Sequence, residues 1–155
     1  MDIFYYWKDH AADIKGRRYG RVTAPSERLT ELKAGYPDYV WAFKNPAGRK
    51  GQIELLARWV WSDRPPAKFR ATPGQSHIFY DPDHPESVWF DGGGSESAVA
   101  SLSAWIAKHH PDAVSMNFKG ECGQQAMRGV VIAELMGLSR LLPTRQFRLA
   151  VPAEA

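Results

Sequence analysis

The stretch QIELLARWVW at residues 52–61 constrains the fold more than any other part of the chain. Its odd-numbered positions are Ile, Leu, Ala, Trp and Trp, whereas its even-numbered positions mix Gln, Glu and Arg with Leu and Val. This alternation predicts a long strand with one side facing a core. The stretch YVWAFK at residues 39–44 alternates in the same way, and the connection NPAGRKG is rich in turn residues. Together the two stretches predict a β-hairpin.

A second strand-like stretch, IFYYWK, occupies residues 3–8 near the N-terminus. Aromatic and β-branched residues dominate it, which favours a strand. Its two faces alternate, with Ile3, Tyr5 and Trp7 on one side and Phe4, Tyr6 and Lys8 on the other. Two explanations for the four successive rings stay open. The strand is either buried on both faces, or it buries one face and presents the other to a ligand.

The other expected elements are short, and no helix of crossover length separates the strands. We expect helices over residues 9–16, 25–35, 95–110 and 120–142, a second hairpin over 77–80 and 87–90, a short edge strand over 68–71, and a final strand over 145–151. Consecutive strands without crossover helices favour antiparallel or mixed pairing. The order therefore predicts one α+β domain over residues 1–155, with a small, curved sheet or barrel and two C-terminal helices.

The single cysteine, Cys122, limits the covalent chemistry of the chain. It excludes an intrachain disulfide and a multi-cysteine metal site, and it favours a reducing compartment. No signal-peptide pattern opens the sequence, and no stretch approaches the roughly 20 apolar residues of a membrane helix. We therefore expect a cytoplasmic protein with no membrane partner. The sequence also lacks a phosphate loop, a dinucleotide fingerprint and a zinc-protease motif, so no cofactor, metal or catalytic residue is predicted.

Positive charge is concentrated in the first half of the chain. Residues 1–75 contain 14 Lys and Arg against 8 Asp and Glu, whereas residues 76–155 contain 6 against 9. Basic residues there alternate with aromatic ones, as in IKGRRYGRV, and further cations follow at Lys44, Arg49 and Lys50. Cations bind phosphates and rings stack on bases, so this pattern favours DNA or RNA as the partner. An ordinary solvated surface remains the alternative.

Two other functional classes stay open. Gln124 and Arg128 lie four residues apart in the expected helix 120–142, so they would share one face and need a partner if buried. Such a pair favours a small enzyme whose polar site also draws on Glu121 and on Asp83 or His84. Alternatively, some of the six tryptophans are exposed and anchor a protein partner. For Cys122, a small buried residue is the simpler explanation than a nucleophile.

Four segments together resemble the PUA-like superfamily, in particular its EVE and YTH-like branch. They are the strand IFYYWK, the basic stretch IKGRRYGR, the helix SERLTELKAG and the hairpin that ends at residue 62. The family's usual Gly-Asp step is replaced by Lys50-Gly51. The resemblance implies a curved barrel that holds a modified or flipped base in an aromatic pocket. On that basis we expect Tyr5, Trp7 and Trp41 as pocket walls and Arg17, Arg18 and Arg21 along the nucleic-acid backbone. From residue type and spacing we add Gln124 and Arg128 as ligand contacts and Lys44 as a backbone contact.

Overall fold

The computed structural model describes residues 1–153, and its α+β fold is built on one strongly curled sheet. The strands are β1 (Asp2–Tyr6), β2 (Arg21–Ala24), β3 (Tyr39–Lys44), β4 (Glu54–Ser62), β5 (Ser76–Asp81), β6 (Val88–Phe90), β7 (Gln124–Met127) and β8 (Thr144–Gln146). The helices are α1 (His10–Gly16), α2 (Arg28–Lys33), α3 (Glu96–His109), α4 (Pro111–Ser115), the 3₁₀ turn η1 (Gly120–Gly123), α5 (Val130–Ser139) and α6 (Phe147–Ala150). The predicted α+β class is confirmed.

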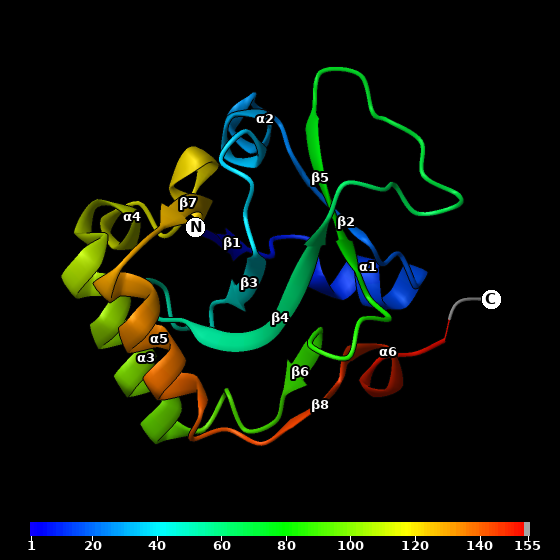
Figure 1. Cartoon of the computed structure of the whole chain (residues 1–155). Coiled ribbons are helices and arrows are strands. Elements are labelled where there is room, and N and C mark those ends of the chain that lie inside the picture. Colours follow the sequence, from blue (N-terminus) through cyan, green and yellow to red (C-terminus); the bar gives the residue numbers. More distant parts are fainter. Residues whose placement is uncertain (154–155) are drawn as a thin grey trace.

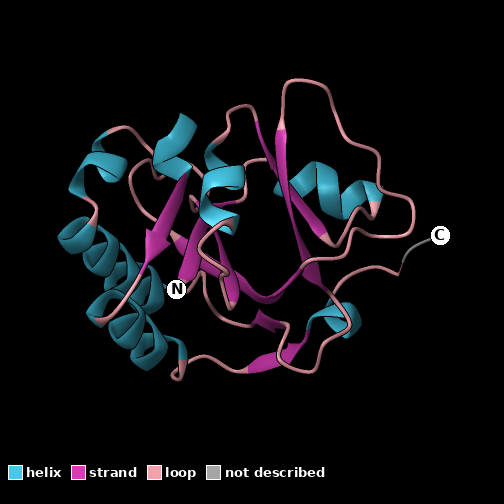
Figure 2. Ribbon diagram, turned by 45° about the horizontal axis from the view of Figure 1, so that its top comes forward, coloured by secondary structure: helices cyan, strands magenta, loops and turns pink. Residues whose placement is uncertain are grey.

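The sheet is mixed and curls into a half-barrel (Figures 1 and 2). Its main path runs β2-β5-β4-β3-β1-β7, and β6 and β8 extend it from β4. The predicted hairpin of β3 and β4 is confirmed, with a register shift between Ala42 and Phe43. β1 runs parallel to β3 and antiparallel to β7, so it lies inside the sheet with a neighbour on each side. A curved mixed sheet was one of the two forms that the element order predicted.

Both faces of this sheet are buried, which answers the question raised by the four successive rings at residues 4–7, three of which lie on β1. The inner face packs Ile3 and Tyr5 in one apolar cluster with Trp59, Tyr80 and residues of α2 and α6. The outer face packs Phe4 in a second cluster with Phe43, whose ring centroid lies 4.7 Å away, and with residues of α3 and α5. Those two helices lie side by side along the outer face (Figure 1). A strand that is buried on both faces needs apolar residues at successive positions, which explains the aromatic run without polar alternation.

The second predicted hairpin is wrong, because β5 and β6 do not pair with each other. β5 pairs with β4 at residues 60–62 and with β2, whereas β6 pairs with β4 at residues 57–58 and with β8. The connection between them is held by the Ser87 hydroxyl group, which donates to the Asp81 carbonyl and accepts from the Val60 N–H. The nine-residue β4 is thus long enough to pair with two short strands, β6 and then β5, along the same edge.

The expected helix over residues 120–142 is also wrong in its first half. Residues 120–123 form a 3₁₀ turn, Gln124–Met127 form β7, and the helix α5 starts only at Val130. Gly129 separates the strand from the helix with φ of +58°, a conformation that favours glycine. The backbone groups of Gln124 are needed in the sheet, where this residue is paired with Tyr5.

The C-terminal region is therefore more varied than the two predicted helices. Besides α3 and α5 it contains the short helices α4 and α6 and the strands β7 and β8. The expected final strand is reduced to β8, after which α6 places Phe147 in the inner core. Residues 68–71, expected as an edge strand, belong to the long connection between β4 and β5. None of the helices within residues 1–153 has the length and apolar character that crossing a membrane requires.

Candidate nucleic-acid interface

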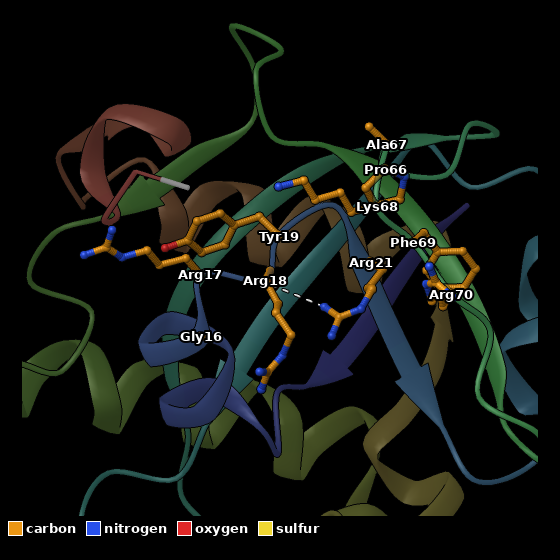
Figure 3. A pocket seen from close by; sticks show the side chains of 10 residues that line it. All are labelled: Gly16, Arg17, Arg18, Tyr19, Arg21, Pro66, Ala67, Lys68, Phe69 and Arg70. Carbon is orange, nitrogen blue, oxygen red and sulfur yellow. Dashed lines mark hydrogen bonds between the residues drawn. The ribbon is translucent and has the colours of Figure 1, made fainter. Parts of the chain in front are cut away.

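Cationic residues from two segments line one pocket of about 530 Å³ (Figure 3). One segment links α1 to β2 and the other belongs to the connection between β4 and β5. We call this hollow the basic pocket; its lining residues are Gly16, Arg17, Arg18, Tyr19, Arg21, Pro66, Ala67, Lys68, Phe69 and Arg70. Five of these residues are Lys or Arg, and none of them is Asp or Glu. The predicted backbone contacts Arg17, Arg18 and Arg21 are therefore brought together.

The turn after α1 positions the first segment. Arg17 adopts the left-handed conformation at φ of 55°, and the N–H of Arg18 donates to the Asp13 carbonyl at 2.9 Å. The Tyr19 side chain is buried, and its hydroxyl group donates to the Pro152 carbonyl at 2.8 Å. Because Tyr19 is fixed from the inside, the arginines before and after it are held at the surface of the pocket.

Asp13 forms ion pairs with two of these arginines. Its Oδ1 lies 3.4 Å from Arg18 Nε and 3.9 Å from an Arg21 guanidinium nitrogen. Its other oxygen, Oδ2, accepts a hydrogen bond of 2.8 Å from the Trp7 indole N–H. Trp7 thus supports the pocket through Asp13. The carboxylate neutralises part of the local positive charge, and it orients both guanidinium groups.

The second segment presents cations on either side of a fixed ring. Phe69 packs edge-on against His77 and Phe79 of β5, with ring centroids 5.0 and 4.9 Å away. Its neighbours Lys68 and Arg70 are exposed. Neither of them, nor Arg17, forms an ion pair with a side chain of residues 1–153. These three charges are consequently free to meet an anion.

The rings expected as pocket walls do not form a common wall. Tyr5 and Trp7 are 4% and 2% exposed on the inner face of the sheet, whereas Trp41 is 0% exposed on the outer face. The Trp41 indole N–H donates to the Asp2 carboxylate at 2.9 Å. Tyr5 and Trp41 lie on strands as predicted, whereas Trp7 follows the end of β1, and the second core behind the sheet buries Trp41 completely.

Next to Trp7, the His10 ring is packed edge-on, with the ring centroids 4.8 Å apart. Burial, assisted by the positive charge of Lys44, lowers the pKa of His10 to about 4. His10 is therefore neutral at pH 7. Lys44 itself lies outside that pocket and pairs with Glu54 at 3.3 Å, so it is not grouped with the three arginines.

Gln124 and Tyr5 instead share a second hollow of about 590 Å³, the tyrosine pocket. Its lining residues are Tyr5, Tyr6, Lys8, Asp9, Thr23, Ala24, Pro25, Gln75, Asn117, Phe118, Lys119, Gly120 and Gln124. Gln124 is 8% exposed, and its Oε1 has no hydrogen-bond partner within residues 1–153. The Tyr6 ring stacks on Phe118 at 5.6 Å, and its hydroxyl group donates to Asn45 at 2.8 Å.

The polar pair expected on a helix is not a pair. Gln124 begins β7 and Arg128 follows its end, so the two lie about 13 Å apart along an extended chain. Arg128 is exposed. The other residues considered for an enzymatic site are engaged elsewhere, since Asp83 pairs with Arg148 at 2.9 Å and His84 accepts the Glu86 N–H. No group of three potential metal ligands occurs within residues 1–153.

No tryptophan within residues 1–153 is fully exposed. Trp7, Trp41, Trp59 and Trp105 are buried, and Trp61 and Trp89 are half-buried. The residues that sequence reasoning missed are Lys68, Phe69 and Arg70, which lie in a proline-rich segment that was interpreted as an edge strand. The succession of a cation, a ring and a second cation in the sequence was the signal that could have identified them as candidate binding residues. Comparisons with family models, curated proteins and solved structures gave no match for this chain.

Proposed function

We propose that this protein binds single-stranded nucleic acid, with its phosphates in the basic pocket. The observation that carries the proposal is that five Lys and Arg residues line one hollow that has no acidic lining residue. Clustered cations on a half-buried aromatic surface are the usual construction of such sites. Phe69 supplies a ring in the same hollow, between Lys68 and Arg70.

The arrangement of partners favours an anionic ligand over a purely structural role. Cations such as Lys108, Arg145 and Arg148 lie within 2.9 Å of carboxylates. In the basic pocket, Asp13 pairs with Arg18 and Arg21, whereas Arg17, Lys68 and Arg70 lie together with no such carboxylate within residues 1–153. Grouping unpaired cations raises their mutual repulsion, and a polyanion relieves it. The resemblance of residues 1–62 to PUA-like domains remains part of the proposal, and the half-barrel and the basic turn after α1 support it.

Binding to a labelled single strand, followed by fluorescence anisotropy across a salt series, tests the proposal. Five phosphate contacts predict that log K falls with log salt at a slope of about −3.5 for a single strand. Affinity is then expected to drop about 100-fold between 50 and 200 mM salt. A strand that binds equally well at both salt concentrations, or that fails to bind at 50 mM, would contradict the proposal.

A further inference from the structure

The basic pocket and the tyrosine pocket are linked through shared lining residues by a third hollow, and we call this series of three hollows the trough. The third hollow is polar and measures about 280 Å³. It shares Arg18, Arg21 and Arg70 with the basic pocket. It shares Asp9, Thr23 and Gln75 with the tyrosine pocket. β2 runs from Arg21 at one end of this trough to Ala24 at the other, a distance of about 10 Å along the strand.

The size of the trough exceeds what one nucleotide needs. Pockets for single drug-sized ligands measure roughly 300–1,000 Å³. The hollows at the two ends measure about 530 and 590 Å³, so each end alone has the size of a complete single-ligand site. A ligand that occupies both ends must also cross the polar hollow between them.

Cationic lining residues outnumber acidic ones along the whole trough. Arg18, Arg21 and Arg70 line the middle together with Asp9 and Asp13, and Lys8 and Lys119 line the tyrosine pocket together with Asp9. Both lysines are exposed. An excess of cations in each hollow favours a ligand that carries negative charge along its length.

The tyrosine pocket also offers what a base requires. Tyr6 supplies a half-buried ring whose position is fixed by stacking on the buried Phe118 and by the hydrogen bond to Asn45. Gln124 supplies a buried amide oxygen that has no partner within residues 1–153. Such an oxygen is stabilised by a donor, and nucleobases carry N–H donors on their edges.

From these observations, and resting on the proposed function, we infer that the ligand is a strand of several consecutive nucleotides and not a mononucleotide. The phosphates of one end occupy the basic pocket, and a base at the other end enters the tyrosine pocket beside Gln124. Lys8 and Lys119 contact the phosphate that flanks this base.

Competition experiments with strands of increasing length test this inference. Unlabelled adenylate and thymidylate strands of one to eight nucleotides compete with a labelled strand of about eight nucleotides. We expect the affinity to rise at least about tenfold between one and four nucleotides, because each stacked base contributes a factor of about 5 to 150. A mononucleotide that competes as well as the four-nucleotide strand overturns the inference and leaves the proposed function intact. If the labelled strand does not bind at all, the proposed function fails as well.

Two variants test the contribution of the tyrosine pocket to binding. Gln124→Met and the double variant Lys8→Ala with Lys119→Ala should each lower affinity for the four-nucleotide strand by about tenfold, the worth of one lost base or phosphate contact. The double variant replaces only exposed side chains, so it reports on binding even if Gln124→Met fails to fold. Unchanged affinity of the double variant for the longer strand contradicts the inference.

Discussion

The combined replacement of Arg17, Lys68 and Arg70 by alanine is expected to weaken single-strand binding by about 100- to 1,000-fold at 50 mM salt. The three side chains line the basic pocket, and none of them has an acidic partner within residues 1–153. Each lost phosphate contact removes about 0.7 from the salt slope, so the slope should fall from about −3.5 to about −1.4. Anisotropy titrations at several salt concentrations give both quantities.

A matched control removes the same amount of charge elsewhere. Lys50, Arg128 and Arg140 are exposed, and they lie outside the trough. Their combined replacement by alanine should leave the affinity within a few-fold of the wild type. The melting temperature should be nearly unchanged in both triple variants, since exposed substitutions usually alter stability by no more than about 0.5 kcal/mol. Equal losses of affinity in the two triple variants would mean that only net charge matters, against a defined site.

The second large effect is expected on stability, at Trp41. Its side chain is completely buried between the outer face of the sheet and the helices, where its ring stacks on Phe90 with centroids 6.0 Å apart. Replacement by alanine should lower the free energy of unfolding by about 3–5 kcal/mol, since a buried Trp leaves a large cavity. It also leaves the buried carboxylate of Asp2 without the indole N–H. Urea denaturation followed by circular dichroism measures the loss.

The more conservative change Trp41→Phe separates a structural role from a role in binding. It keeps a ring in the outer core, so the protein should fold with reduced stability and bind the labelled strand with unchanged affinity. Trp61→Ala serves as the comparison, because Trp61 is only half-buried and should cost less stability. A Trp41→Phe variant that is stable but no longer binds would restore Trp41 as a wall of the ligand site.

Much of the sheet could be predicted because its strands carry a local signal. The hairpin of β3 and β4 follows from alternation on both sides of a turn. Local signal failed for β5 and β6, because nothing in their own residues shows that β4 is long enough to pair with both. The stretch before Gly129 was misread for a similar reason, since its apolar residues fit a helix as well as a strand beside β1.

The candidate site was only partly predictable for a related reason. The three arginines at positions 17, 18 and 21 were recognised from residue type alone. Their partners Lys68 and Arg70 are about 50 positions further along the chain, and only the path of the long connection between β4 and β5 brings them close. Likewise, Gln124 reaches Tyr5 through strand pairing that its own surroundings in the sequence do not reveal.

Mapping the bound strand onto the protein by nuclear magnetic resonance tests the central claim most directly. The ¹⁵N-labelled protein would be titrated with an unlabelled strand of about eight nucleotides, and amide shifts followed residue by residue. We predict the largest changes at residues 16–21 and 66–70, with further changes around Thr23 and Gln124 along the trough. Changes confined to α3, α5 or the turn between β3 and β4 would contradict the account.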